Sequence, residues 1–442
     1  MMLRRLAHSW LLRPALLAGL WGAATAALAD GSGADAELGR LRAAAAQQQP
    51  ALVATLKQLV EIESGSADRE GLERIATLAS ERLKALGGRV RWIEPSDDLY
   101  RMGDTPERVG PMVEARFAGR GQAKILLLAH LDTVYPRGML AEQPFRIEGD
   151  KAYGLGIADD KQGVALVLHL LEMLRGQPEW GELTVLFNSD EEISSPASRA
   201  HITRLGAEHD VVLSFEGGGG PAGPDSLRLA TSGIAAAYLR VKGRAAHAGA
   251  APERGVNAIY ELSHQLLQAR DLSDRRVGRQ VHWTLARGGI VRNMIPPAAE
   301  ASADIRVDRV ADFDGIERTL RERIQNKLLP ESEVTLDFER RRPPLQASEA
   351  SRRLAREAVP LALASGLQPV VRDQPSGGGT DAAFAALQTR APVIEGMGLR
   401  GAGAHTRDAE YVMLDSIVPR LLFGARLILA ISRGELRGQA AP

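Results

Sequence analysis

The chain contains no cysteine, so disulfide bonds and thiolate metal sites are excluded, and any bound metal must be held by His, Asp or Glu. It also has no excess of charge, since 55 Lys and Arg residues balance 55 Asp and Glu residues. No overall field therefore attracts nucleic acid or an anionic membrane, and neither is expected as a partner. The remaining composition, 45% hydrophobic and 25% charged over 442 residues, is typical of a globular protein of two or three domains.

The sequence also lacks a hydrophobic run long enough to span a membrane. Its most apolar stretch, Ala15–Leu28, is shorter than the roughly 20 residues that a membrane helix needs. Arg4 and Arg5 precede it and Ala27-Leu28-Ala29 fits a small-x-small cleavage site, so residues 1–29 are predicted to be a signal peptide. We therefore expect an exported protein, periplasmic or secreted, without stable membrane insertion after cleavage. A retained interfacial anchor is the alternative.

Strand and helix patterns alternate through the first half of the chain. Met112–Ala118 and Lys124–His130 predict a hairpin around Gly119-Arg120-Gly121, and the second of these strands is apolar on both faces and therefore central. Leu183–Asn188 and Asp210–Phe215 predict two more buried strands. This β-α-β rhythm predicts an α/β fold with an open mixed sheet and helices on both faces.

Two further patterns set the boundaries of the domains. The Ala-rich segment Ala34–Gln49 predicts a poorly packed helix, and a separate amphipathic helix is expected to begin at Pro50. After residue 231 the rhythm changes to β-α-β-β-α-β, a ferredoxin-like unit that closes before the hinge prolines Pro343 and Pro344. We therefore predict a discontinuous larger domain, residues 30–231 and 343–442, interrupted by an inserted domain, residues 232–342.

Two adjacent carboxylates, Asp159 and Asp160, follow a pair of glycines and precede a helical pattern. Adjacent carboxylates repel each other, so a turn that contains both usually holds a cation. The glycine spacing is similar to that of a nucleotide-binding loop, but Asp159 stands in place of the third glycine and would repel a phosphate. An acidic helix N-terminus, the alternative, accounts for one carboxylate rather than two.

Other candidate ligands follow predicted central strands, at the edge where open α/β sheets bind ligands. His130 ends one strand, and Asp132, on the same face, is placed to orient its imidazole. Glu191 and Glu192 follow the next strand, and Glu216 follows another. Taken singly, these residues also fit a core histidine, a solvated acidic turn and a plain strand-end carboxylate. Their convergence at one edge favours a metal site.

Four sequence blocks and one late histidine occur together. They are Ala129-His-Leu-Asp-Thr-Val134, Gly154-x-Gly-x-x-Asp159-Asp-Lys, Ser189-Asp-Glu-Glu192, Gly377-Gly-Gly-Thr-Asp-Ala382 and the histidine of Gly403-Ala-His405. Together they resemble the dinuclear-zinc exopeptidase and aminoacylase family, which includes deacylases, dipeptidases and bacterial glutamate carboxypeptidases. The resemblance covers about residues 51–431 and is strongest to the folate-cleaving glutamate carboxypeptidases, for example in Ala246-His-Ala-Gly-Ala-Ala-Pro252.

The resemblance implies a site for two zinc ions per subunit. Asp159 is similar to the carboxylate that bridges the two ions, and the family often has a cis peptide bond after it, here between Asp159 and Asp160. The other implied ligands are His130 and Glu216 for one ion and Glu192 and His405 for the other.

The resemblance also implies catalytic roles. Glu191 is similar to the general base that moves a proton from water to the departing amine, and Asp132 would support His130. His247 resembles a histidine that reaches the neighbouring subunit's site and stabilises the oxyanion, so a homodimer through the inserted lid domain is expected. A surface or interface histidine is the alternative for His247.

Substrate recognition is implied for a third group of residues. Asn293 and Arg306 resemble lid residues that hold the free carboxylate beside the scissile amide, for which the planar fork of Arg is suited. Arg342 is a candidate for a second carboxylate, with a solvated arginine as the alternative. The residues expected to let backbone approach the substrate are Gly378, Gly379 and Thr380.

The sequence therefore predicts an exported zinc-dependent carboxypeptidase that releases a C-terminal amino acid, preferably glutamate, from an N-acyl or peptidyl substrate. Ser226 stands where we expect a lysine in folate-cleaving members, which leaves glutamate or folate preference less firmly implied than hydrolysis. The first alternative is an N-acyl-amino-acid deacylase or dipeptidase with the same chemistry. The second is a non-catalytic exported protein that binds zinc or an amino acid, against which Glu191 argues because ligation alone does not need it.

Overall fold

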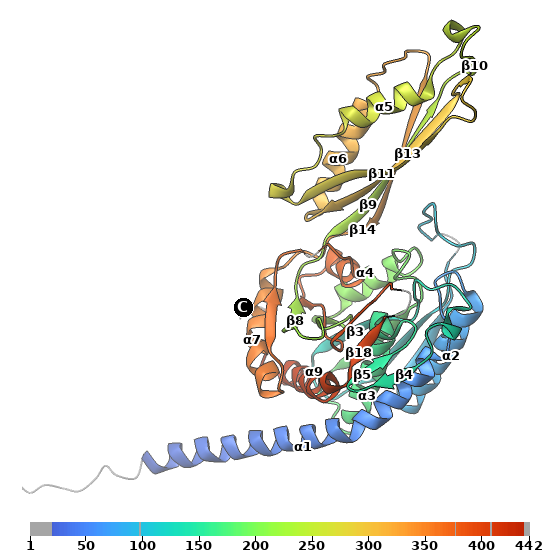
Figure 1. Cartoon of the computed structure of the whole chain (residues 1–442). Coiled ribbons are helices and arrows are strands. Elements are labelled where there is room, and N and C mark those ends of the chain that lie inside the picture. The colour runs from blue at the N-terminus through green and yellow to red at the C-terminus, as the bar shows by residue number, and fades with distance from the viewer. Residues whose placement is uncertain (1–19, 97–98, 376, 407–408, 437–442) are drawn as a thin grey trace, which may run out of the picture.

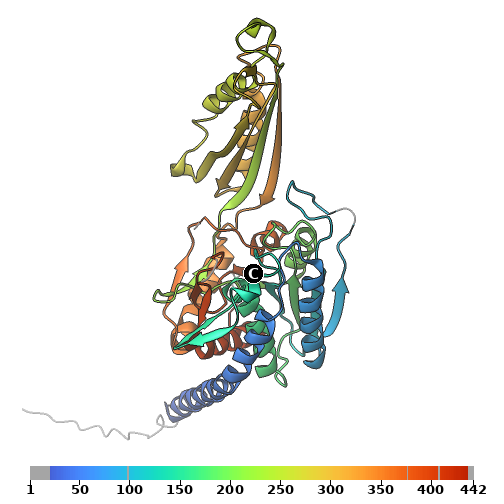
Figure 2. The same ribbon diagram turned by 45° about the vertical axis from the view of Figure 1, so that its right-hand side comes forward.

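The computed structural model describes residues 20–96, 99–375, 377–406 and 409–436. Two bodies, each with its own sheet and hydrophobic core, are connected where the chain crosses between them near residues 232 and 343 (Figures 1 and 2). The predicted α/β fold interrupted by an inserted domain is confirmed. The first 19 residues of the predicted signal peptide lie outside the described residues. Among the described residues, no helix is sufficiently long and apolar to cross a membrane.

The first helix differs from the expectation. A single helix, α1 (Leu20–Val60), runs through Pro50, and Figures 1 and 2 show its first turns extending away from the larger body. Leu41 and Ala45 are buried in the main core, so the segment before Pro50 is packed rather than loose. This packing, together with a hydrogen bond from Arg42 to the backbone oxygen of Ala364 at 2.9 Å, helps to offset the roughly 3 kcal/mol that an internal proline costs a helix.

The larger body is built on a six-stranded mixed sheet, in the order β1-β2-β6-β3-β7-β16. The four strands β6, β3, β7 and β16 are parallel to one another, and β2 and β1 continue the sheet in antiparallel fashion. The bounds are β1 (Arg89–Ile93), β2 (Met112–Ala118), β3 (Lys124–His130), β6 (Glu182–Asn188), β7 (Val211–Ser214) and β16 (Val393–Ile394).

Both faces of this sheet are covered, as the apolar pattern of β3 predicted. Ile125, Leu127 and Ala129 join the core formed with α1, α3 and α9, whereas Leu126 and Leu128 join a second core formed with α4 and α8. The bounds are α3 (Gln162–Met173), α4 (Arg199–Glu208), α8 (Ala382–Ala385) and α9 (Ile417–Ser432). Alternate side chains of a strand point to opposite faces, so a strand buried on both sides must be apolar throughout.

The predicted hairpin between β2 and β3 is wrong, because β6 lies between these two strands and pairs with both. Gly119 and Gly121 do not turn β2 onto β3. Instead their N–H groups donate to the backbone oxygens of Gly181 and Trp180, at 3.0 and 2.9 Å. A Cβ at Gly119 would lie 1.9 Å from the oxygen of Trp180, so these glycines permit the segment that enters β6 to approach closely.

The smaller body is a four-stranded antiparallel sheet in the order β11-β13-β9-β14, with α5 and α6 packed on one face (Figure 1). Its order along the chain is β-α-β-β-α-β, as predicted. Residues of β9 and β13 alternate between buried and accessible, so the face without helices is open. The bounds are β9 (Gly233–Lys242), α5 (Ala258–Gln268), β11 (Arg279–Gly288), β13 (Ala298–Val307), α6 (Val310–Arg323) and β14 (Glu333–Arg342).

Smaller elements complete the two bodies. The larger body also contains α2 (Arg69–Ala85), α7 (Glu349–Ala364), the antiparallel strands β4 (Arg146–Glu148), β5 (Lys151–Tyr153), β18 (Tyr411–Met413) and β17 (Gly401–Ala402), and the parallel pair β8 (Asp225–Arg228) and β15 (Pro369–Arg372). The far end of the smaller body carries the short pair β10 (Ala246–His247) and β12 (Met294–Ile295).

Candidate metal centre

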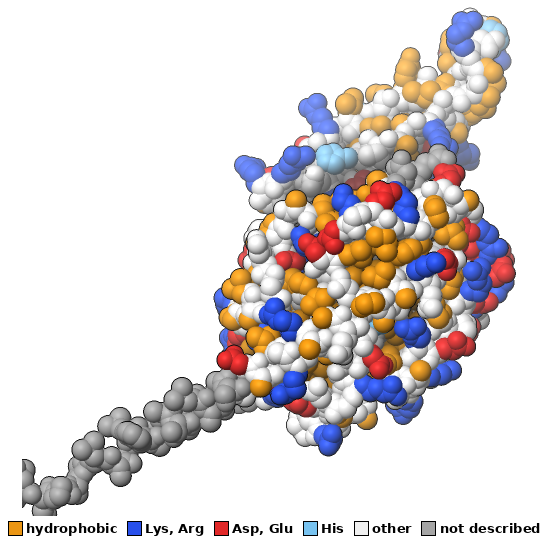
Figure 3. Space-filling model, turned by 60° about the horizontal axis from the view of Figure 1, so that its bottom comes forward, with side chains coloured by type: hydrophobic (Ala, Val, Ile, Leu, Met, Phe, Trp, Pro, Cys, Tyr) orange, Lys and Arg blue, Asp and Glu red, His pale blue; other side chains and the backbone are white. Residues whose placement is uncertain are grey.

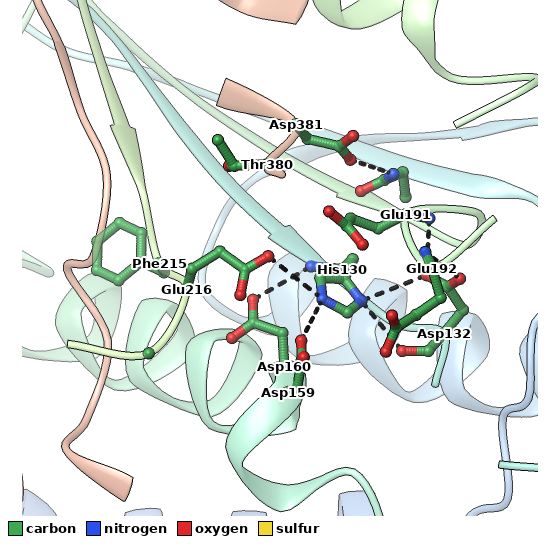
Figure 4. A network of polar contacts seen from close by, with 12 residues as sticks. His130, Asp132, Asp159, Asp160, Glu191, Glu192, Phe215, Glu216, Thr380 and Asp381 are labelled. Carbon is green, nitrogen blue, oxygen red and sulfur yellow. Dashed lines mark hydrogen bonds and ion pairs between the residues drawn. The ribbon is translucent and has the colours of Figure 1, made fainter. Parts of the chain in front are cut away.

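Three neighbouring parallel strands, β6, β3 and β7, end at the same edge of the large sheet, and each is followed there by a predicted ligand. His130 is the last residue of β3, Glu192 lies in the turn after β6, and Glu216 lies two residues beyond β7. Asp159 and His405 reach the same place from separate loops. Figure 4 shows how the residues from the strand ends point toward one another.

The carboxylate of Asp159 stands between two histidines. Its Oδ1 lies 3.0 Å from Nε2 of His130, and its Oδ2 lies 3.1 Å from Nε2 of His405. Oε1 of Glu216 is 3.5 Å from the same nitrogen of His130, and Oε2 of Glu192 is 3.2 Å from that of His405. The five side chains form two groups that share Asp159, the arrangement that a carboxylate bridging two cations requires.

Asp132 supports this arrangement from the side of the sheet. Nδ1 of His130 lies 3.0 Å from the backbone oxygen of Asp132 and 3.3 Å from its Oδ1. The same carboxylate accepts hydrogen bonds from the N–H groups of Glu191 and Glu192, each at 3.0 Å, and from the hydroxyl of Ser66 at 2.7 Å. Asp132 therefore fixes both the imidazole, whose Nε2 is left for a cation, and the acidic turn.

The electrostatics of the cluster favour positive charge. Burial and the nearby charge of Asp159 raise the pKa of Glu192 and of Glu216. Hydrogen bonds to Asp159 and Glu192 raise the pKa of His405. Buried carboxylates repel one another and keep protons on the imidazoles, so a metal cation that displaces those protons would be strongly favoured.

The donor set fits a pair of divalent metal ions. It offers two imidazole nitrogens, two terminal carboxylates and the carboxylate of Asp159 between them, which are donors that Zn²⁺ accepts. Oε1 of Glu192 is buried and has no hydrogen-bond partner among the described residues. A buried oxygen without a partner is costly, and coordination to a cation would satisfy it.

The peptide bond between Asp159 and Asp160 is cis, as the resemblance implied. Asp160 does not join the ligand groups: its Oδ1 accepts a hydrogen bond from Nε2 of Gln162 at 2.6 Å, and its Oδ2 lies 3.4 Å from the backbone nitrogen of His130. Of the two adjacent carboxylates, Asp159 alone therefore faces both histidines.

The turn that carries Asp159 is held by Glu410, a residue that sequence analysis did not identify. The buried carboxylate of Glu410 accepts three hydrogen bonds from backbone N–H groups of residues 156–159, at 2.8 to 3.2 Å, and one from the hydroxyl of Tyr135 at 2.6 Å. That hydroxyl also lies 2.9 Å from the backbone oxygen of Thr406, next to His405. Glu410 and Tyr135 thus connect the segments of two ligands, although neither belongs to a recognisable block.

Arg342 lies in the wall of the site, and the alternative of a solvated arginine is wrong because only 4% of its surface is exposed. Its Nη1 lies 2.6 Å from Oε1 of Glu191 and 3.0 Å from Oδ1 of Asp381. Asp381, which belongs to the block Gly377–Ala382 but was given no role from the sequence, in turn accepts a hydrogen bond from Asn188 at 2.6 Å. Burial raises the pKa of Glu191, and the charge of Arg342 opposes that rise.

A cleft of about 710 Å³ extends from the metal ligands to the open face of the smaller sheet. Of the predicted substrate residues, Arg306, Arg342, Gly378 and Gly379 line it. The guanidinium of Arg306 makes two 2.9 Å contacts with its neighbour Asp304 and reaches the backbone oxygen of Gly377 at 3.0 Å. Thr380 is buried beneath the cleft, where its hydroxyl donates to Glu395 at 2.7 Å.

His247 and Asn293 are not brought to this cleft. Both lie around the β10–β12 pair at the far end of the smaller body (Figure 1), where the N–H of Ala248 donates to the backbone oxygen of Asn293 at 3.0 Å. Nδ1 of the exposed His247 accepts hydrogen bonds from Gly249 and Ala250, at 3.1 and 3.0 Å. Its Nε2 has no partner among the residues that the structure describes.

A mixed α/β sheet with two groups of histidines and carboxylates at its edge, beneath a cleft that the inserted domain covers, is suited to a metal-dependent hydrolase. The sequence pattern of the peptidase family M20/M25/M40 matches residues 126–430. The chain belongs to this family and is a metallo-exopeptidase.

Comparisons with individual proteins agree with this assignment. The chain is 43% identical to carboxypeptidase G2 of Pseudomonas sp. (strain RS-16) over 394 residues. This match covers 89% of this chain and 92% of that protein. The crystal structure of aminopeptidase PepT from Bacillus cereus is similar in fold, with a TM-score of 0.69 at 19% identity over 87% of this chain and 98% of that chain. The YXEP protein of Bacillus subtilis, described as a dinuclear metal binding peptidase, has a TM-score of 0.61 at 16% identity over 87% and 98%.

Proposed function

We propose that the protein is an exported carboxypeptidase with two zinc ions per subunit, which releases a C-terminal amino acid, preferably glutamate, from N-acyl or peptidyl substrates. One observation carries the proposal. Glu191, His130 and Glu216 form one group of side chains close enough together to surround an ion, and the adjacent Glu192 belongs to a second group with Asp159 and His405. A carboxylate in that position can accept a proton from a water molecule that lies between the two groups. The preference for glutamate rests on the resemblance of the sequence blocks to glutamate carboxypeptidases.

A bound metal pair would supply an acidified water and a polarised amide carbonyl. Glu191 takes a proton from the attacking water and later gives it to the departing amine nitrogen. Arg342, 2.6 Å from Oε1 of Glu191, holds this carboxylate in place and opposes the rise in its pKa that burial causes. Arg306, in the cleft wall, binds the free carboxylate of the substrate beside the scissile bond.

We also propose a homodimer, in which each cleft is completed by His247 and Asn293 from the lid of the other subunit. Two observations support it. The cleft of a single chain contains neither residue, and both lie on the exposed far end of the lid. Hydrophobic side chains are visible on the surface of both bodies (Figure 3). Among the lid residues, the side chains of Tyr260, Leu267 and Ile290 are 63%, 64% and 77% exposed. Contact with another subunit would cover these apolar side chains.

A panel of substrates tests the reaction. Release of the C-terminal amino acid is measured from folate-like, N-acetylated and dipeptide substrates that share a C-terminal glutamate, with and without a chelator. The proposal predicts chelator-sensitive release that is fastest from the folate-like or other N-acyl glutamates. Preference for the acetylated or dipeptide substrate would favour the deacylase or dipeptidase alternative. No release from any of them would favour the binding protein.

Export and dimerisation are tested separately. The proposal predicts that the protein recovered from outside the cytoplasm begins at Asp30, as intact mass measurement would show, because cleavage follows Ala27-Leu28-Ala29. It also predicts the mass of a dimer in sedimentation experiments. Recovery of the full-length chain at the membrane would instead support the retained anchor.

A further inference from the structure

Strand β14 ends in three consecutive arginines, Arg340, Arg341 and Arg342, whose side chains go to different places. The pairing of β14 with β9 shifts between Arg340 and Arg342, so Arg341 is the extra residue of a β-bulge. Side chains of a regular strand alternate between faces, whereas a bulge allows two consecutive side chains to point the same way. Arg341 and Arg342 both line the cleft, and Arg340 does not.

Two of these arginines, Arg340 and Arg342, form ion pairs with carboxylates outside β14. Arg342 is buried against Glu191 and Asp381, as described above, so its charge is used within the protein. Arg340 points to the other side, where it lies 2.7 Å from Asp314 and 2.8 Å from Glu317 of α6. Arg341 is therefore the member of the run that remains for a ligand in the cleft.

The partner of Arg341 is a carboxylate from the other body. Nη2 of Arg341 lies 2.9 Å from Oδ1 and 2.6 Å from Oδ2 of Asp104, and its Nη1 lies 3.3 Å from Glu339. The side chain of Arg341 is 14% exposed, but that of Asp104 is 58% exposed and belongs to a surface turn at the cleft. An ion pair with so exposed a partner contributes little stability, so a carboxylate from a ligand can replace Asp104.

We propose that Arg341 binds a second carboxylate of the substrate, and that the carboxylate of Asp104 occupies this position when no substrate is bound. The inference rests on the proposed carboxypeptidase function, in which Arg306 binds the first carboxylate. Arg306 on β13 and Arg341 on β14 are separated by β9 alone, or about 10 Å between strand axes. Two long side chains can close that span onto one small dicarboxylate. The substrate class is therefore an amide with a second carboxylate, on either the released amino acid or the acyl group.

Two pairs of substrates show whether Arg341 binds a carboxylate of the released amino acid or one of the acyl group. N-benzoyl-glutamate is compared with N-benzoyl-glutamine, and N-succinyl-phenylalanine with N-butyryl-phenylalanine, so that each pair differs in one carboxylate. Arg341→Gln should lower kcat/KM for the acidic member of one pair by about 10- to 100-fold, because a charged hydrogen bond is lost. The neutral member should change by less than about threefold. The pair that responds identifies the part of the substrate that Arg341 binds.

Two further variants sharpen the result. Asp104→Asn should raise kcat/KM several-fold for the same acidic substrate, through a lower KM, because the internal competitor loses its charge. Arg340→Gln, in the adjacent position but outside the cleft, is the matched control and should alter neither pair selectively. Equal losses for acidic and neutral members in Arg341→Gln, or no loss for either, would overturn the inference.

The test remains decisive if the proposed reaction is wrong. Should the wild-type protein hydrolyse none of the four substrates, binding of glutarate to the zinc-loaded protein is measured by calorimetry. Binding that is at least tenfold weaker in Arg341→Gln than in Arg340→Gln would support the assignment of Arg341. Equal binding by the two variants would reject it independently of catalysis.

Discussion

The metal centre and the lid differ in how their functional side chains are held. At the centre, His130 is 1% exposed and is fixed by Asp132, and Asp132 also accepts hydrogen bonds from the backbone of Glu191 and Glu192 in the turn after β6. In the lid, His247 and Asn293 are exposed and are held mainly through local backbone contacts. The first region is assembled within one chain, whereas the second is proposed to act on the cleft of another subunit.

This difference predicts two kinds of variant. Changes at the centre should alter proton transfer or metal binding for every substrate, because each side chain there is tied to several others. Changes in the lid should depend on the substrate or on a second subunit, because the lid side chains have few partners of their own. Replacements of single residues in each region test this division.

Replacement of Glu191 by glutamine tests the centre most directly. Glu191→Gln should retain both metal ions but lower kcat by about 10²- to 10⁴-fold for all substrates, because the amide cannot accept the proton. Metal content is measured by atomic emission and kcat by steady-state kinetics. Glu192→Gln serves as the comparison, since loss of a ligand should reduce metal content as well. Near-normal turnover in Glu191→Gln would refute the role of general base.

Replacement of His247 tests whether the lid acts on another subunit. His247→Ala should lower kcat by about 10²- to 10³-fold, the cost of removing one oxyanion donor. Mixing this variant with Glu191→Gln should restore activity to about a quarter of that of the wild type, because random pairing gives half heterodimers with one intact site each. Failure of the mixture to regain activity, with exchange of subunits confirmed by mass, would place His247 outside the site of its partner.

The parts of the site that sequence predicts well are those fixed by local rules. Ligands at the ends of buried parallel strands, such as His130 and Glu216, follow from strand patterns because all such ends meet at one edge. The lid topology follows in the same way from its β-α-β-β-α-β rhythm. The prediction of a hairpin at Gly119 and Gly121 was wrong because strand patterns do not show which strands pair with each other. In the structure, β6 lies between β2 and β3.

The residues that were missed take their roles from tertiary contacts alone. Glu410 and Asp381 are single carboxylates whose partners lie far away in the chain, on the Asp159 turn and on Arg342. Arg341 differs from its two neighbours only through a bulge, which no local pattern indicates. Helix α1 likewise continues past Pro50 because of side chains it packs against elsewhere. Sequence patterns thus identify the proposed metal ligands more readily than the residues that position them.

Glu410 is not a proposed metal ligand, but it holds the backbone of the turn that carries Asp159. Glu410→Gln leaves the shape unchanged but puts an amide N–H₂ where a carboxylate oxygen now accepts hydrogen bonds, so the Asp159 turn should loosen. We expect metal affinity to fall by about 10- to 100-fold, as for other residues that orient metal ligands. Affinity is measured by competition with a chromophoric chelator. Unchanged affinity in a folded variant would contradict the positioning role.

Glu114→Gln is the matched control for Glu410→Gln, and it carries the smallest prediction of its own. Glu114 is equally buried but contacts no ligand-bearing segment; instead it lies 2.7 Å from His201 and 2.8 Å from Arg116. Burial opposes ionisation of Glu114, but hydrogen bonds from these two residues lower its pKa to about 2. The variant should keep its metal affinity and lose about 1–3 kcal/mol of stability at neutral pH.

The sign of this pKa shift fixes the pH dependence of that loss. The folded-state pKa of Glu114 lies below its ordinary value of 4.5, so its ionised form stabilises the fold above that pH. The stabilisation disappears as the pH falls from about 4.5 to about 2. The difference in free energy of unfolding between the wild type and Glu114→Gln should therefore shrink on acidification, as denaturant titrations at neutral pH and near pH 3 would measure. If the difference in free energy of unfolding stayed constant between the two pH values, Glu114 would stabilise the larger body through its packing rather than through its charge.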